Sequence, residues 1–302
     1  MSVYVEQNSS YRNYDTNKSW VILSSIESSI KEKIEKKGTP LKEWNITIYR
    51  GILTGYNKAF IIDSAKKDEL IAADPKSAEI IRPILRGRDI SRYYYKAPEL
   101  WLINTHNGIK DKKIPPININ DYPAIKIHLD QFYDSLSKRT DKGETPYNLR
   151  NCTYMDDFSK QKMVWKRIGS LLRFSLDNSG AICLDSTCLA VGKDIPFLTA
   201  VLNTTMGNYL FRNAPKTGTG DLLISVQAVD PIMVPKPNEN ERRIIESLLY
   251  EIIDISERNK DYSIKEKELE EIVFAMYGIN EEEKKYIENV VNTNFREKKT
   301  DF

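Results

Sequence analysis

The sequence has few cysteines and no long apolar run. Its 302 residues include three cysteines, Cys152, Cys183 and Cys188, an odd number that does not suit a disulfide framework and favours a reducing environment. No apolar stretch approaches the roughly 20 residues that a membrane helix needs. The polar start, rich in Tyr, Asn and Ser, does not have the pattern of a signal peptide. We therefore expect a cytoplasmic protein without membrane contact, with a flexible segment at residues 1–18.

The motifs of a DNA methyltransferase are also missing. An adenine methyltransferase needs an Asn or Asp before Pro-Pro and an aromatic residue after it, to hold the amino group of the base. The only Pro-Pro pair, Pro115-Pro116, lies between isoleucines. The glycine-rich run at residues 217–220 follows a predicted helix instead of a strand, so we interpret it as a loop and not as a cofactor site. The sequence thus predicts neither S-adenosylmethionine nor any other cofactor in this chain.

Nuclease and zinc chemistry are poorly supported. Glu99, Asp111 and Lys113 match the letters of a Mg²⁺-dependent nuclease, but Asp111 and Lys113 lie in a charged, turn-like stretch and not on a strand. With two histidines and no tetrahedral set of ligands, a zinc site is not expected. A self-contained nuclease using these three residues remains the alternative enzyme hypothesis, whereas the main prediction is a chain with no catalytic centre and no metal site.

Apolar periodicity predicts a mixture of helices and strands. Leu23, Ile26, Ile30 and Ile34, for example, recur at helical spacing. The predicted helices cover residues 19–37, 77–81, 121–136 and 196–212, two long stretches after residue 236, and a short third stretch after Asn280. The predicted strands cover residues 46–49, 59–63, 99–104, 163–168, 171–176, 181–184 and 222–226. The change in character at residue 236 predicts one domain at 19–236 and a helical support or docking element at 237–302.

Charge is distributed unevenly. Residues 239–288 hold 15 acidic and 8 basic residues, a balance of −7. Because the net charge of the chain is +2, the other residues together carry +9. A basic body with an acidic helical tail suits a protein that binds a polyanion, although many other proteins share this feature.

An ordered series of motifs resembles the TaqI-like C-terminal specificity domain of type IIG restriction-modification enzymes. The motifs span residues 19–291 and include GTPLKEW (38–44), IYRGILTGYNKAF (48–60), IIRPILRGRDI (80–90), YPAIK (122–126), DKG (141–143), YNLR (147–150), WKRI (165–168), VLNT (201–204), VPKP (234–237) and ELEEIVFAMYGI (268–279). The resemblance implies an α+β fold, a mixed-sheet target-recognition domain followed by helices.

The resemblance also implies partners. Double-stranded DNA is the expected ligand, and the methyltransferase and nuclease domains that family members carry ahead of this segment are absent. The chain is then either a piece of a larger enzyme or a separate specificity subunit that binds a methyltransferase chain. S-adenosylmethionine and Mg²⁺ are expected for the parent enzyme.

The DNA contacts are inferred from side-chain chemistry, because the resemblance assigns none. Residues 138–173 hold nine basic and four acidic residues, and Lys142, Arg150, Lys166 and Arg167 are the favoured contacts. Arg86, Arg88 and Arg92, interleaved with tyrosines, suit phosphate contact or groove insertion, or a solvated surface over core tyrosines. The remaining candidates occupy polar loops, where ordinary turns are the alternative: Arg50, Thr54, Tyr56, Asn57 and Lys58; His106 and Asn107, which could read bases; and Lys216, Thr217 and Thr219, which could hold phosphates.

Overall fold

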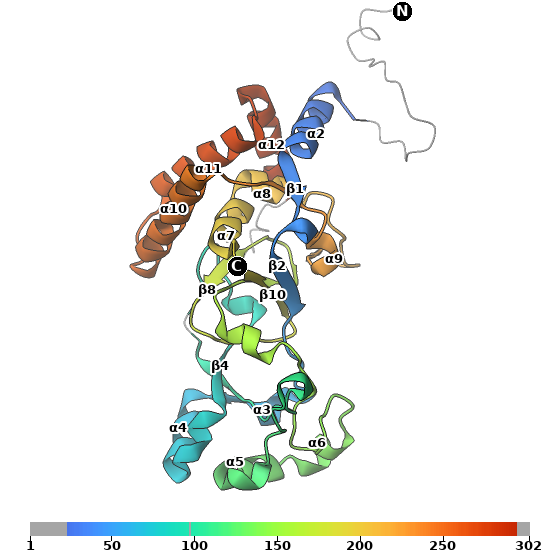
Figure 1. Ribbon diagram of the computed structural model, residues 1–302, viewed down its shortest axis with the longest axis vertical. Helices are drawn as coiled ribbons and strands as arrows, with labels where there is room; N and C mark the ends of the chain where they lie inside the picture. The colour runs from blue at the N-terminus through green and yellow to red at the C-terminus, as the bar shows by residue number, and fades with distance from the viewer. Residues whose placement is uncertain (1–22, 97, 295–302) are drawn as a thin grey trace, which may run out of the picture.

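The structure, a computed structural model, describes residues 23–96 and 98–294 and shows two lobes stacked along one axis (Figure 1). The predicted flexible segment at 1–18 lies outside the described residues. The upper lobe contains α2 (Ser25–Lys37), α7 (Ile195–Asn203), α8 (Thr205–Leu210), α10 (Glu239–Glu257), α11 (Ser263–Tyr277) and α12 (Glu281–Asn294). The lower lobe contains α3 (Asn57–Phe60), α4 (Ser64–Ala73), α5 (Pro123–Asp130) and α6 (Tyr133–Lys138).

A four-stranded antiparallel sheet lies between the two hydrophobic cores. Its order is β2 (Ile46–Arg50), β10 (Thr187–Gly192), β6 (Lys162–Lys166) and β8 (Phe174–Asp177). Successive side chains of a strand point to opposite faces. Met163 and Trp165 therefore contribute to the upper core, whereas Val164 contributes to the lower one. Because apolar residues cover both faces, the sheet joins the two lobes.

The helices that follow residue 236 belong to the upper core. Ile245 and Leu249 of α10 and Val273 of α11 are buried in the same cluster as Ile30 of α2 and Trp165 of β6. Asn238 begins α10 with a capping box, because its side chain accepts from the backbone of Glu241 and the Glu241 carboxylate accepts from the backbone of Asn238. The predicted helical character of this region is confirmed, and its helices pack directly on the domain that precedes them.

A second four-stranded sheet supports the lower lobe. Its order is β3 (Ile61–Asp63), β5 (Leu100–Ile103), β4 (Ile81–Leu85) and β9 (Ile182–Cys183). The β4–β9 pair is parallel and the other pairs are antiparallel, so the predicted α+β class with a mixed sheet is confirmed. Two small antiparallel pairs complete the strands, β1 (Gly38–Pro40) with β12 (Met233–Pro235) and β7 (Ile168–Gly169) with β11 (Leu222–Leu223).

Several predicted helices differ from those observed. The helix expected at 77–81 is a 3-10 helix, Pro75–Glu79, and the chain then enters β4. Pro83 lies inside that strand. It is the last residue paired with β5 and precedes the first residue paired with β9, so its missing N–H group costs little. The helix expected at 121–136 is divided into α5 and α6, and their apolar residues still face one core.

The expected helix at 196–212 breaks for a visible reason. Asn203 turns its side chain to the backbone of Phe174, accepting from the N–H and donating to the carbonyl, and Thr204 then caps α8 by accepting from Gly207. Three strand predictions were also wrong in extent. The strand expected at 59–63 begins only at Ile61, after α3, and the strand expected at 171–176 begins only at Phe174. The strand expected at 222–226 is shorter, because β11 ends before a short helix, α9 (Val226–Val229). Strand β10 was not predicted, because its buried faces leave no alternation to detect.

Candidate nucleic-acid interface

One end of the central sheet presents cationic side chains. Arg50 is the last residue of β2 and Lys166 is the last residue of β6, and both are opposite the start of β10 in the register. The two side chains therefore emerge at the same end of the sheet. Arg50 forms an exposed ion pair with Asp185 at 3.4 Å. Lys166 is exposed and has no hydrogen bond or ion pair within the described part of the chain.

The loop before β5 brings another arginine to this end of the sheet. Arg86 donates to the Asp89 carboxylate through Nε at 3.0 Å and Nη2 at 2.8 Å, and these bonds raise the pKa of Arg86. The pair fixes the turn in which the N–H of Gly87 donates to Ser186 Oγ at 3.1 Å. A Cβ on Gly87 would lie 2.9 Å from Cγ of Lys166, so the loop touches the end of β6. Arg88 is the exposed cation of this loop.

A hairpin extends the same surface. Leu222 of β11 pairs with Gly169 of β7 on one side and bridges to Lys216 on the other. Lys216 is exposed, and the hydroxyls of Thr217 and Thr219 lie 2.8 Å apart in the hairpin turn. Arg167, between β6 and β7, has a buried Nε without a hydrogen-bond partner among the described residues. We name the cations gathered here the strand-end cluster: Arg50, Arg88, Lys166, Arg167 and Lys216.

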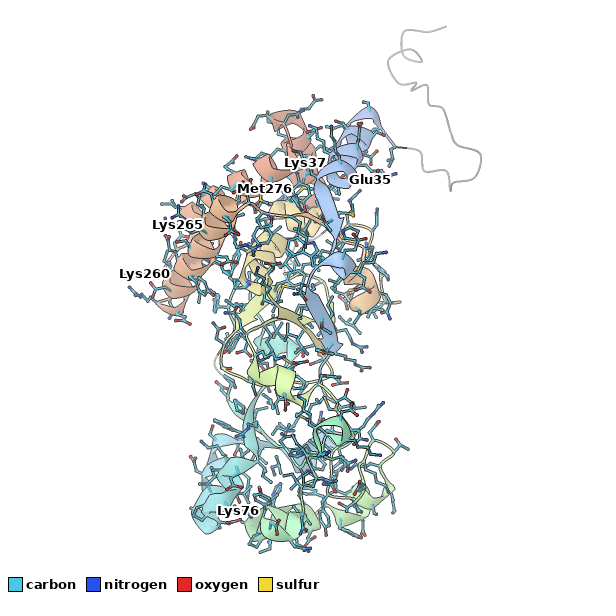
Figure 2. The ribbon with its side chains drawn as sticks, viewed as in Figure 1. Glu35, Lys37, Lys76, Lys260, Lys265 and Met276 are labelled. Atoms are coloured by element: carbon cyan, nitrogen blue, oxygen red, sulfur yellow. The ribbon has the colours of Figure 1, made fainter. Side chains whose placement is uncertain are left out.

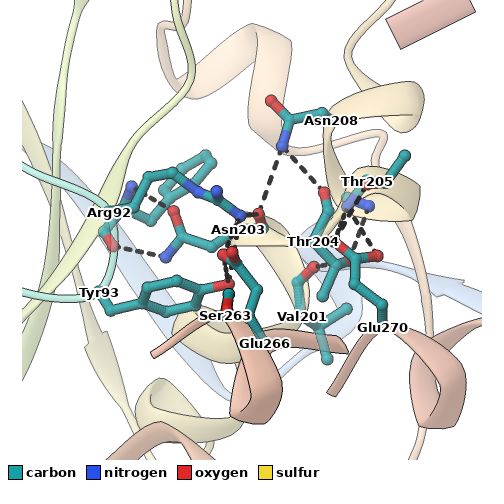
Figure 3. A network of polar contacts seen from close by, with 12 residues as sticks. Arg92, Tyr93, Val201, Asn203, Thr204, Thr205, Asn208, Ser263, Glu266 and Glu270 are labelled. Carbon is teal, nitrogen blue, oxygen red and sulfur yellow. Dashed lines mark hydrogen bonds and ion pairs between the residues drawn. The ribbon is translucent and has the colours of Figure 1, made fainter. Parts of the chain in front are cut away.

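The Arg92 side chain is 35% exposed, and its contacts are with α7 and α11 and not with this cluster (Figure 3). It donates to the Asn203 carbonyl at 2.6 Å and forms an ion pair with Glu266 of α11 at 2.6 Å. The hydroxyl of Tyr93 donates to the same Glu266 carboxylate at 2.9 Å. This network connects the segment after Arg88 with α7 and α11, which is a positioning role.

Of the lower-lobe candidates, the residues after β2 form a turn. Thr54 is buried, and its hydroxyl donates to Oδ1 of Asn57 at 2.6 Å. Tyr56 packs against Phe132, whereas the Lys58 side chain is exposed. Thr54 and Tyr56 therefore shape the turn, and Asn57 and Lys58 begin α3 at the surface.

The other lower-lobe candidates lie in two facing loops. Asn107 bridges them by donating to Asn151 at 2.6 Å and accepting from the N–H of Glu144 at 2.7 Å. Lys142 donates to the Ser137 carbonyl at 2.6 Å. His106 accepts from the N–H of Gly108 through Nδ1 at 3.1 Å. These contacts hold the loops in place.

Two basic residues of the 138–173 region are structural. Arg139 is buried, donates to several backbone carbonyls of the turns around it, and lies over the Phe60 ring. Burial lowers the pKa of Arg139 to about 10. Lys162 is fully buried and pairs with Asp177. The excess of positive charge in this region is thus smaller at the surface than the sequence suggests.

A cavity connects the strand-end cluster to the lower lobe. It has a volume of about 300 Å³ and is lined by residues 50–53 and 149–155. Arg50 and Arg150 are both among the residues that line it. The Arg150 side chain is 64% exposed and forms an ion pair with Asp141 at 3.2 Å, so it adds a cation to the same surface.

The residues of the alternative nuclease hypothesis lie in separate segments on either side of β5. Glu99 precedes β5, whereas Asp111 follows it in a 3-10 helix, Lys110–Lys112, and all three candidate side chains are exposed. Within residues 23–96 and 98–294, no group of three or more His, Cys, Asp or Glu residues is arranged to hold a metal ion. None of the helices in these ranges combines the length and apolar character needed to cross a membrane.

Sequence reasoning missed the Asp185–Ser186 turn. This turn anchors both Arg50 and Gly87, and it precedes β10, the strand that was not predicted. A prediction of β10 from the sequence would have placed this turn at the end of the sheet. The five cations of the strand-end cluster, in contrast, were all predicted candidates.

Comparison with known proteins finds a family that part of the chain resembles. Residues 82–224 match the family model of the TaqI-like C-terminal specificity domain. Over these residues the chain is similar to TaqI-like specificity domains. The match confirms the predicted resemblance over a narrower range than the motifs suggested, and it includes every residue of the strand-end cluster except Arg50. No curated protein matches the chain in sequence.

One solved structure of a restriction-modification enzyme shares the fold of this chain. The type IIL restriction-modification enzyme MmeI, solved in complex with DNA, matches with a TM-score of 0.64 and 14% identity, over 85% of this chain and 36% of that one. The type IIG restriction endonuclease BpuSI matches with a TM-score of 0.47 and 12% identity, over 90% of this chain and 33% of that one. The chain thus spans about a third of the length of either enzyme.

Proposed function

We propose that the chain is the DNA target-recognition module of a bacterial type II restriction-modification enzyme and acts in the cytoplasm. The observation that carries this proposal is the strand-end cluster. β2, the 86–89 loop, the end of β6 and the hairpin each place a cation at one end of the central sheet, and most of these residues lie inside the matched specificity domain.

The charges of this surface suit the DNA backbone. Lysine and arginine neutralise phosphates, and the release of condensed counterions drives the binding of duplex DNA. The hydroxyls of Thr217 and Thr219 add hydrogen-bond donors of the kind that position a backbone. The acidic helices α10 and α11 lie to the left in Figure 1, whereas β2 and α9 lie to the right, so the acidic surface would repel DNA from the other side. This arrangement would favour one orientation of the duplex.

Recognition of a DNA sequence requires side chains that contact base edges, in addition to the side chains that contact phosphates. Asn57 and Lys58 on α3, together with Arg150, are exposed on the lower lobe and chemically able to contact base edges. Arg50 and Arg150 border the same cavity, so the lower lobe continues the surface of the strand-end cluster. A duplex that crosses both lobes would receive its backbone contacts from one lobe and its base contacts from the other.

The catalytic steps would belong to other parts of the parent enzyme. A methyltransferase and a nuclease, joined in the same chain or supplied as separate subunits, would hold S-adenosylmethionine and Mg²⁺. A methyltransferase in the same reading frame would indicate a piece of one enzyme, and one in a separate frame would indicate a specificity subunit. We expect no Mg²⁺-dependent cleavage of DNA by the 302-residue chain, and such cleavage would support the alternative enzyme hypothesis.

The proposal is tested by selecting duplexes from a randomised pool with the full chain at low salt. A recognition module enriches one sequence motif, and a motif-containing duplex binds more tightly than a scrambled duplex of the same length. Each base pair that is read contributes about 1–3 kcal/mol of discrimination. Binding of duplexes that share no common sequence would show that the chain binds DNA without sequence specificity and would contradict its role in target recognition. No binding at any salt concentration would contradict the proposal as a whole.

A further inference from the structure

A short hairpin on the lower lobe presents lysines to solvent. Ile109 and Ile114 form an antiparallel bridge, in which the N–H of each donates to the carbonyl of the other at 2.9 and 3.1 Å. The 3-10 helix Lys110–Lys112 and the next residue, Lys113, form the tip, and all four tip residues are exposed. We name residues 109–114 the lysine hairpin. None of them belongs to the strand-end cluster or to the DNA contacts predicted from the sequence.

The base of the hairpin is fixed to the rest of the lower lobe. Ile109 is buried, and Nδ2 of Asn148 donates to the carbonyl of Ile117, three residues after the hairpin, at 2.9 Å. Ahead of the hairpin, the Thr105 carbonyl accepts from the N–H of Leu149 at 2.8 Å. The tip is therefore held at a defined position on the lower lobe.

Positive charge predominates at the tip. It contains three lysines, Lys110, Lys112 and Lys113, and one carboxylate, that of Asp111. Lys112 forms an ion pair with Asp156, whereas the side chains of Lys110 and Lys113 form no hydrogen bond or ion pair within the part of the chain that the structure describes. Two ammonium groups are thus left to bind an external anion.

The backbone at Lys113 has a conformation that favours glycine. Its φ of 56° and ψ of 29° are left-handed, and there the Cβ of an L-residue comes too close to the following carbonyl oxygen. At the equivalent position after α11 the chain has Gly278.

Two other non-glycine residues in the described ranges have a positive φ. Tyr93 is buried in the upper core, and Asn259 is of a residue type that tolerates this conformation. Lys113 has neither explanation, because its side chain is exposed and has no polar partner in the protein. We therefore interpret this side chain as one that serves a ligand and not the fold.

The lysine hairpin lies beside the surface that we propose for DNA. Lys112 pairs with Asp156, and the preceding residue, Met155, lines the cavity that Arg50 and Arg150 also line. Cations therefore continue from the strand-end cluster, past this cavity, to the hairpin. A duplex that follows these cations would bring its phosphates to the tip.

We propose that the lysine hairpin holds the phosphate backbone of DNA where the duplex passes the lower lobe, through Lys110 and Lys113. The inference rests on the proposed function and extends it, because it adds a backbone contact beside the lower-lobe residues that are able to contact base edges. Lysine binds a phosphate as a point charge on a flexible stem, so the hairpin anchors the duplex without reading its sequence.

The test substitutes Lys113 in the full chain and measures duplex binding at several salt concentrations. Lys113→Gly removes both the charge and the Cβ, so it should weaken the binding of all duplexes without lowering the midpoint of urea unfolding. One lost phosphate contact flattens the slope of log K against log salt concentration by about 0.9, so the loss of affinity should be about 3.5-fold larger at about 50 mM than at about 200 mM salt.

Two variants separate charge from backbone conformation. Lys113→Arg keeps the charge and should keep the wild-type affinity and slope. Asn259→Gly makes the same change to a left-handed residue on the upper lobe, and this matched control should also bind as the wild type does. If Lys113→Gly does not fold, Lys110→Gln removes the neighbouring charge and should flatten the slope in the same way.

The outcomes separate the two proposals. Wild-type affinity and slope in folded Lys113→Gly would overturn the hairpin assignment, as would an equal loss in Lys113→Arg or in Asn259→Gly. If the wild-type chain binds duplex DNA but neither Lys113→Gly nor Lys110→Gln weakens binding, only the hairpin assignment fails. If the wild-type chain binds no duplex at low salt, the proposed function fails with it.

Discussion

Glu270 should make the stability of the protein depend on pH near neutrality. It lies on α11, and its carboxylate accepts from the backbone N–H of Thr205 at 2.7 and 3.0 Å, at the start of α8 (Figure 3). Burial raises the pKa of Glu270 from an ordinary 4.5 to about 7, against the lowering effects of Thr205 and Arg92. The folded chain therefore keeps this carboxyl group protonated up to a higher pH than the unfolded chain does.

The direction and the magnitude of the change in stability follow from the difference between the folded and unfolded pKa values of Glu270. Between pH 4.5 and pH 7 the folded chain binds the proton more strongly than the unfolded chain does, so stability is present at low pH and is lost as the pH rises through the folded pKa. Each pH unit is equivalent to about 1.4 kcal/mol, so the full effect is at most about 3 kcal/mol, and we expect about 1–3 kcal/mol. Glu270→Gln keeps an oxygen to accept from Thr205 and removes the titration.

The assay is urea unfolding at several pH values from 5 to 8. The wild-type free energy of unfolding should fall relative to that of Glu270→Gln as the pH rises. Glu268→Gln, an exposed substitution on the same helix, is the control and should follow the wild-type profile. Parallel profiles for the wild type and Glu270→Gln would refute the reasoning, because the buried carboxyl would then titrate as it does in the unfolded chain.

Three further predictions concern the cores and the cofactor. Leu249→Ala should lower the free energy of unfolding by about 2–5 kcal/mol, and hydrogen exchange should then show faster opening of α7 as well as α10, because both helices belong to one core. Lys162→Met should destabilise the protein by about 3–5 kcal/mol in chemical unfolding by leaving Asp177 buried and charged, whereas Lys162→Met with Asp177→Leu should cost less; equal losses would contradict this account. Calorimetry should detect no saturable binding of S-adenosylmethionine at micromolar concentrations, and a saturable isotherm would show that the chain holds the cofactor.

The sequence predicted those elements whose pattern is local. The helix around Ile30 and Ile34 and the long helices after residue 236 were recognised because their apolar residues follow helical spacing. β10 was not, since its residues are buried on both faces and show no alternation. The break at Asn203 also has no local signal, because it depends on hydrogen bonds to Phe174, which is distant in the sequence.

The candidate interface, like the fold, was predictable only where its features are local in the sequence. Charge and loop position identified Lys166, Arg88 and Lys216, but only the strand register shows that they meet at one end of the sheet. Arg92 was selected by the same reasoning, and the structure places it in a partly exposed network with Glu266 instead. Composition cannot separate these two cases, because both consist of arginines or lysines in polar or charged stretches of the sequence.

The central claim is tested most directly by the salt dependence of DNA binding. The variant is Lys166→Ala with Arg167→Ala, and the control is Lys36→Ala with Lys37→Ala, which removes the same charge from α2 at the upper end of the molecule (Figure 2). Unfolding curves check that both variants fold.

Each phosphate contact contributes about 0.9 to the slope of log K against log salt concentration. The account predicts that the cluster variant binds all duplexes more weakly and flattens this slope by up to about 2, while the control keeps the wild-type affinity and slope. Unchanged affinity and slope in the folded cluster variant, or an equal loss in the control, would contradict the placement of DNA on the strand-end cluster.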